Sequence, residues 1–193
     1  MIPLVDLQKY QKEARLKDET KVLLRPMVAE DRDALYEFFK AVPTEEVRYL
    51  RDDVSSRAVV GRWAENLDYA RTLPILAVKN GDIIADATLN RRRSGWKWHL
   101  GTVRVFVHKD FRRVGLGHLM IEEIVRVAEK LELEKLIVEI PDVNAPAINA
   151  FRKAGFYRTA VIPGLVKDRE NQPVDVVVMI RDLKPRYDYE YDL

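Results

Sequence analysis

Hydrophobic residues recur along the chain with two periods, and each period predicts a different kind of element. Short apolar runs rich in β-branched residues predict strands, and helical spacing over longer stretches predicts helices. The expected strands are residues 22–26, 75–79, 83–90, 96–107, 135–140, 157–162 and 174–181. The expected helices are residues 34–42, 56–70, 116–131 and 144–154. This alternation predicts an α/β fold with a central mixed, twisted sheet of about seven strands and helices on both faces.

The two ends of the chain carry weaker patterns than its middle. Residues 2–19 are highly charged, and a thin stripe at helical spacing predicts a helix there. The stripe consists of Leu4, Leu7, Gln11 and Ala14. We therefore expect a helical extension over residues 1–19, one domain over residues 20–183, and a tail over residues 184–193. The tail is rich in tyrosine, which makes it a candidate contact in a homodimer.

The most informative stretch is Arg112–Gly117, which joins a predicted strand to a predicted helix. Such a junction places free backbone N–H groups and the positive end of a helix dipole at one point. Gly115 and Gly117 would let the backbone approach a phosphate without a Cβ in the way. The junction therefore predicts a site for a phosphorylated ligand.

Two common nucleotide-binding motifs do not fit this junction. A dinucleotide fingerprint requires glycine where the chain has Met120. A P-loop requires Lys followed by Ser or Thr where the chain has His118 and Leu119. Both classes of ligand site are excluded.

The junction and a second block further along the chain resemble the Gcn5-related N-acetyltransferase (GNAT) family. The family's Arg/Gln-x-x-Gly-x-Gly/Ala loop matches Arg112, Gly115 and Gly117. Residues 144–156 resemble its Asn-x-x-Ala-x-x-x-Tyr-x-Lys-x-Gly-Phe pattern, with Phe151 in place of Tyr. The resemblance covers roughly residues 21–183 and is greatest to stand-alone relatives of the bacterial protein-lysine acetyltransferases. It implies the GNAT-type acyl-CoA N-acyltransferase fold.

The resemblance also implies acetyl-CoA as co-substrate, and it implies which residues bind it. The pantetheine arm is expected against the backbone of the strand that precedes the loop, and the pyrophosphate at the backbone N–H groups of the loop. Asn144 is expected to hold the pantetheine arm or a water, to cap its helix, or to do both. The implied binding residues are Phe106, Val107, His108, Arg112, Arg113, Val114, Gly115, Leu116, Gly117, His118, Asn144, Ala147, Phe151 and Lys153.

The implied reaction is direct attack of a primary amine, from a protein lysine or a small molecule, on the thioester. A lysine-like amine has a pKa of about 10.4, so a base must first remove a proton. The family often has Glu where this chain has Thr102 and a Tyr acid where it has Phe151. The remaining candidate bases are Glu139, His99 and Asp86, acting directly or through a water.

Each candidate base also has a structural interpretation. Glu139 would lie at an exposed strand position or in an ion pair, His99 would pack or lie on the surface, and Asp86 would face solvent. With both usual catalytic residues replaced, the alternative function is a catalytically weak acetyl-CoA-binding sensor or interaction module.

A basic and aromatic segment precedes the strand that leads to the loop. Arg91–Arg93 would form a solvated turn, receive an acidic substrate protein, or bind the 3′-phosphate of CoA. Trp96 and Trp98 share a face of the predicted strand 96–107, which predicts core packing or a substrate wall.

Composition narrows the classes of partner. The 193 residues carry 33 basic and 31 acidic side chains, a net charge of +2 that gives no reason to expect nucleic acid or membrane as the main partner. Without cysteine and with three histidines, the chain is not expected to bind a metal. The sequence lacks a signal-peptide core and a transmembrane-length apolar run, so we expect a cytoplasmic protein.

Overall fold

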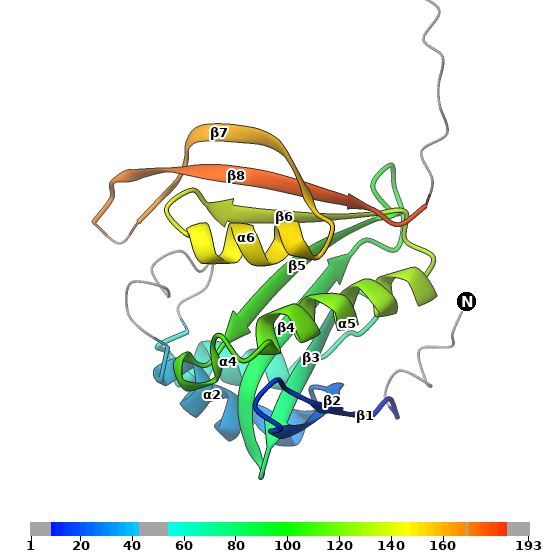
Figure 1. Cartoon of the computed structure of the whole chain (residues 1–193), viewed down its shortest axis with the longest axis vertical. Helices are drawn as coiled ribbons and strands as arrows, with labels where there is room; N and C mark the ends of the chain where they lie inside the picture. Colours follow the sequence, from blue (N-terminus) through cyan, green and yellow to red (C-terminus); the bar gives the residue numbers. More distant parts are fainter. Residues whose placement is uncertain (1–8, 43–53, 169, 185–193) are drawn as a thin grey trace, which may run out of the picture.

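The computed structural model describes residues 9–42, 54–168 and 170–184, and its centre is one mixed sheet (Figure 1). The eight strands lie in the order β1-β2-β3-β4-β5-β6-β8-β7, one strand more than the sequence pattern predicted. The strands are β1 Lys12–Arg15, β2 Lys21–Pro26, β3 Thr72–Lys79, β4 Asp82–Arg91, β5 Leu100–Val107, β6 Lys135–Pro141, β7 Tyr157–Lys167 and β8 Pro173–Asp182.

Helices cover both faces of the sheet, as the sequence pattern predicted. Helices α5 and α6 lie in front of the sheet in Figure 1, and α2 and α4 lie behind it. The helical elements are the 3₁₀ turn η1 Ala29–Asp31, α2 Arg32–Lys40, α4 Arg57–Glu65, the 3₁₀ turn η2 Lys109–Phe111, α5 Leu116–Lys130 and α6 Ala145–Lys153. Within the described part of the chain, none of the helices is long and apolar enough to cross a membrane.

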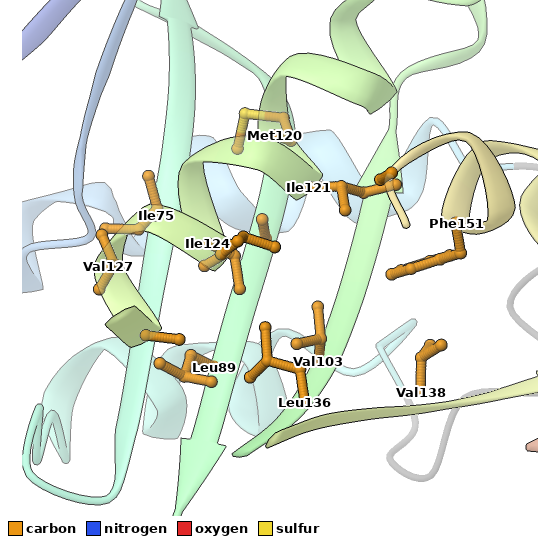
Figure 2. Packing of buried hydrophobic residues seen from close by; sticks show 14 of the residues in the cluster. Ile75, Leu89, Val103, Met120, Ile121, Ile124, Val127, Leu136, Val138 and Phe151 are labelled. Carbon is orange, nitrogen blue, oxygen red and sulfur yellow. The ribbon is translucent and has the colours of Figure 1, made fainter. Parts of the chain in front are cut away.

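Each face of the sheet has its own apolar core. Helix α5 packs its apolar face onto the sheet, and Phe151 of α6 extends the same core toward β6 (Figure 2). The smaller core behind the sheet holds Phe38 and Phe39 of α2 against Leu76 and Ile83 of the sheet. The labelled side chains in Figure 2 are Ile75, Leu89, Val103, Met120, Ile121, Ile124, Val127, Leu136, Val138 and Phe151.

The middle of the sheet opens between β5 and β6. These two strands are parallel, as predicted, but they pair only where Leu100–Thr102 faces Lys135–Ile137. Beyond that point β5 continues along β4, and β6 continues along β8. The sheet therefore splits toward the carboxyl ends of β5 and β6, where Figure 1 shows the two ribbons diverging.

The helix predicted over residues 2–19 is wrong where the structure describes this segment, and residues 1–8 lie outside the described residues. Residues 12–15 form β1, which pairs antiparallel with β2. Burial alternates with period two in β1, and Lys12 and Tyr10 both donate hydrogen bonds to Glu123 of α5. Glu123 is fully buried, so this long-range contact fixes the segment against α5 and overrides the weak local pattern.

The strand predicted over residues 96–107 begins only at Leu100. Residues 96–99 form turns, with Trp98 N–H bonded to the Gly95 carbonyl at 3.0 Å. Trp96 and Trp98 are therefore not core residues: 82% and 54% of their surfaces are exposed. The alternation rule failed here because it applies to extended backbone and these residues are not extended.

Candidate active site

The gap between β5 and β6 leaves one edge of β5 without a neighbouring strand. From Val103 to Val107, β5 pairs with β4 on one side, and the structure describes no strand paired to its other side. Such an edge presents backbone N–H and C=O groups that can pair with an extended ligand. Phe106 and Val107, which the sequence comparison implied as ligand contacts, lie on this edge, and His108 follows it.

The N-terminus of α5 stands at the open end of the gap. Gly115 is its N-cap residue with φ of +92°, and the N–H groups of Leu116, Gly117 and His118 precede the first helical hydrogen bond, from Leu119 N–H to the Gly115 carbonyl. No described side chain caps this end, and its first turn carries no acidic residue. The uncapped N–H groups and the dipole of a helix of 15 residues make an anion site.

Basic residues hold and surround this loop. Arg112 donates from Nε and Nη2 to the Val107 carbonyl, both at 3.2 Å, which ties the loop to the end of β5. Arg113 is exposed and has φ of +64°. The Lys17 N–H donates to the Val114 carbonyl at 3.1 Å, so the β1–β2 connection also supports the loop. Lys17 was not predicted from the sequence, because its partner lies about a hundred residues away.

The α6 residues implied by the family pattern have mixed surroundings. The Asn144 side chain accepts a hydrogen bond from Ala147 N–H at 3.2 Å, so its capping role is confirmed. Phe151 is 4% exposed and meets the Phe156 ring edge-on at 5.0 Å, which places it in the core. Lys153 is exposed in the last turn of α6.

A buried polar cluster lies behind the sheet, close to the gap. The Asp86 carboxylate accepts hydrogen bonds from Thr88 Oγ1 at 3.0 Å and from Arg104 Nη2 at 3.3 Å. Burial raises the pKa of Asp86, while Arg104 and Thr88 oppose that rise. The Arg104 guanidinium lies 5.0 Å from the Trp63 ring centre and 5.5 Å from that of Phe106. Asp86 therefore faces Arg104 rather than solvent, contrary to the solvent-facing alternative.

Sequence reasoning missed Arg104 and Trp63. The available signal was a charged residue inside the apolar run Val103–Val107, where an unpaired charge is costly to bury. The partner could not be named from sequence, because Asp86 lies on the neighbouring strand.

The three candidate bases are not brought together. Thr102 and Ile137 are paired, so Arg104 and Glu139, two residues further along, lie on the same face on opposite sides of the gap. Glu139 is exposed. His99 lies in the turn before β5, at the closed end of the gap, with its ring 5.9 Å from that of Trp98. Among the residues described, we find no group of three or more His, Cys, Asp or Glu that could hold a metal ion.

Comparison with known proteins relates this geometry to one family. Residues 29–156 match the family model described as the acetyltransferase (GNAT) family. The chain is 29% identical over 110 residues to the streptothricin acetyltransferase of Streptomyces lavendulae, covering 57% of this chain and 56% of that protein. It is 26% identical over 81 residues to YwnH of Bacillus subtilis, a candidate phosphinothricin acetyltransferase, covering 42% and 49%. The chain thus spans about half the length of these curated relatives.

Solved structures share the fold over more of the chain. The structure of yncA, a candidate acetyltransferase from Salmonella typhimurium with its cofactor acetyl-CoA, matches with a TM-score of 0.71 and 19% identity. The match covers 86% of this chain and 96% of that one. At this identity the likeness establishes the fold alone.

Proposed function

Because the chain belongs to the GNAT acetyltransferase family, we propose that it transfers an acetyl group from acetyl-CoA to a primary amine. One observation carries the proposal: the unpaired edge of β5 leads directly to the uncapped N-terminus of α5. A ligand with an extended amide arm and a pyrophosphate would pair with the first and bind the second.

The residues present fit acetyl-CoA, which would supply an acetyl thioester at the gap. The edge at Phe106 and Val107 offers backbone groups for the amides of the arm. The N–H groups of Leu116, Gly117 and His118 would hold the pyrophosphate, with Arg113 adding charge beside them. Arg112 positions this loop through its bonds to the Val107 carbonyl.

We assign the general base to Glu139 rather than to Asp86 or His99. Glu139 is exposed on the strand that borders the gap, so it can take a proton from the amine directly or through a water. Asp86 already accepts from two donors and is 2% exposed, which suits it to positioning Arg104. His99 lies at the closed end, away from the unpaired edge of β5.

The second candidate function, an acetyl-CoA sensor without turnover, rests on Phe151. Its ring is buried in the core and has no proton to give to a leaving thiolate. A free thiol has a pKa of about 8.5, so a thiolate can leave near neutral pH without an acid. Release of free thiol in the presence of an amine separates the two functions.

Two kinds of amine are candidate acceptors: the amine of a small molecule and the side chain of a lysine. The two relatives are named for phosphinothricin and streptothricin, which favours a small-molecule amine as the first class to assay. Arg104 is paired with Asp86 and lies on the same face of the sheet as Glu139, across the gap. It would favour an acceptor that also carries an acidic group. Lysine peptides are the second class.

The binding step is tested by calorimetric titration with acetyl-CoA of the wild type, His118→Glu and His118→Gln. His118 is exposed in the first turn of α5, where a carboxylate favours the helix dipole but repels a phosphate. We expect His118→Glu to lose at least about tenfold in affinity while its thermal stability is kept, and His118→Gln to bind like the wild type. A wild type that does not bind acetyl-CoA would refute both candidate functions.

The chemical step is tested by thiol release with a panel of amines. Glu139→Gln should slow release about 10²–10⁴-fold and keep acetyl-CoA affinity, since general base catalysis contributes about that much. Equal loss in Asp86→Asn with unchanged rates in Glu139→Gln would reassign the base. No release by the wild type with any amine, together with tight binding, would favour the sensor.

A further inference from the structure

The connection between β4 and β5, residues 92–99, is exposed and rich in aromatic and basic residues. It follows Arg91, the last residue of β4, and contains Arg92, Arg93 and Lys97. Trp96 and Trp98 are 82% and 54% exposed, which is unusual for indole rings. Lys97 Nζ lies 5.1 Å from the centre of the Trp96 ring. We call Arg71 together with residues 91–99 the Arg–Trp hairpin.

Four arginines of the Arg–Trp hairpin line a surface hollow that is suited to binding an anion. The hollow has a volume of about 360 Å³ and is lined by Arg71, Arg91, Arg92, Arg93 and Ser94, with no carboxylate in its lining. Asp68 lies beside it, 3.7 Å from Arg71 Nε. Arg91 Nε is buried, and no described group accepts its hydrogen bond. An acceptor-only group such as a phosphate would satisfy this donor and the clustered charge.

The hairpin is distant from the proposed CoA site. Ala85 pairs with Val107, where the loop to α5 begins, whereas Arg91 pairs with Gly101, six residues further along β4. At about 3.3 Å per residue the two ends are about 20 Å apart. Figure 1 shows the connection at the end of the sheet where β5 and β6 meet, away from the open gap. The arginines therefore cannot contribute to the anion site at α5, and the 3′-phosphate of the same CoA is not their ligand.

We propose that the Arg–Trp hairpin binds single-stranded nucleic acid, with its arginines on the phosphates and Trp96 and Trp98 stacked on bases. Guanidinium groups bind phosphate in a bidentate manner, and exposed aromatic rings stack on bases of any sequence. This combination uses both features of the hairpin.

Two other polyanions fit the hairpin less well. An acidic peptide would satisfy the arginines but would leave both indoles exposed to water. A membrane surface would attract the arginines and the two indoles, but residues 91–99 contain no aliphatic side chain to enter the acyl region, so a membrane would hold this segment only at its interface. Nucleic acid alternates phosphates with flat bases, and so it matches a cluster of cations next to two indoles.

The proposal departs from the expectation drawn from net charge. A net charge of +2 describes the whole chain, and it conceals the four arginines that line one hollow beside Asp68. Binding confined to one hairpin should be weak, because few phosphates are neutralised. It should also weaken as salt rises, because each neutralised phosphate releases counterions.

The test uses the full chain and fluorescein-labelled 12-mers of oligo-U and oligo-dT, followed by anisotropy and by intrinsic tryptophan fluorescence. Four phosphate contacts predict a slope of about −2.8 for log affinity against log salt, or about a 50-fold loss between about 50 and 200 mM. Arg92→Ala/Arg93→Ala should halve that slope. Both residues are exposed, so the fold is retained. The matched control, Arg15→Ala/Arg158→Ala, removes the same charge from exposed positions elsewhere and should keep the slope.

Tryptophan fluorescence separates nucleic acid from the other polyanions. Bases stacked on Trp96 and Trp98 should quench the signal, and Trp96→Ala/Trp98→Ala should abolish that quenching and weaken binding by at least about fivefold. The third tryptophan, Trp63, reports only the background. Preferential binding of poly-Glu or of phosphatidylglycerol vesicles would overturn the proposal in favour of an acidic protein or a membrane. No binding of either oligonucleotide at about 50 mM salt, or equal loss in the control variant, would overturn it outright.

Discussion

The two glycines of the loop before α5 should respond differently to the same substitution. Gly115 has φ of +92°, where an alanine costs about 1–2 kcal/mol, and an added Cβ would lie 3.4 Å from Lys17 Cγ. Gly117 lies inside the first turn of α5, and its added Cβ would make an ordinary contact, 3.6 Å from Val107 Cγ2. Alanine there should gain about 0.5–1 kcal/mol, because glycine is unfavourable inside a helix. We expect Gly115→Ala to be less stable than Gly117→Ala by about 1.5–3 kcal/mol.

Urea denaturation followed by circular dichroism measures this difference directly. Thermal denaturation gives the same difference as a shift in Tm of about 3–12 °C, at about 2–4 °C per kcal/mol for a chain of this length. Acetyl-CoA titration adds a functional readout, since Gly117→Ala keeps the backbone N–H that the proposed site uses. Equal stability of the two variants, or a less stable Gly117→Ala, would refute the assignment of Gly115 as the N-cap of α5.

Three further predictions concern stability, and urea denaturation measures each. Burial alone would raise the pKa of Glu123, but bonds from Lys12 and Tyr10 outweigh it and hold that pKa below its ordinary value. Its stabilisation should therefore be present above about pH 4.3 and fall away as pH drops further, while Glu123→Gln should show a flatter pH profile. Gly101→Ala should cost about 1–3 kcal/mol, because the added Cβ would lie 2.7 Å from side chains of Leu136 and Leu89; an unchanged midpoint would contradict this packing. Asn144→Ala should cost about 1 kcal/mol through loss of the α6 cap, and Asn144→Asp should retain most of it.

The sequence predicted those parts of the fold that depend on local patterns. The strand, loop and helix around Arg112–Gly117 were expected from periodicity and glycine placement, and the structure has β5, the loop and α5 there. The capping of α6 by Asn144 was also expected, because capping depends on three neighbouring residues.

Prediction from the sequence failed mainly where contacts between distant residues decide the structure. Strand β1 exists because β2 and Glu123 hold it, and neither partner is near in sequence. The pair of Asp86 and Arg104 required knowledge of strand register. Core packing was one of two interpretations of Trp96 and Trp98, and it was wrong because the alternation was extended across a turn. In the first two cases the local pattern was too weak to outweigh long-range pairing. In the third case a local turn, with Trp98 N–H bonded to the Gly95 carbonyl, replaced the extended backbone that alternation requires.

The short junction between β5 and β6 has a mechanical consequence. Five antiparallel strands on one side and three on the other are joined in the ladder by only three residue pairs, Leu100–Thr102 with Lys135–Ile137. Beyond these three pairs, the two parts of the sheet are joined through the apolar core that α5 and α6 cover. An extended molecule that pairs along β5 would add backbone contacts at the place where the ladder has none. Its arrival should slow amide exchange in β6 and β8 as well as in β5, although β8 lies beyond the gap.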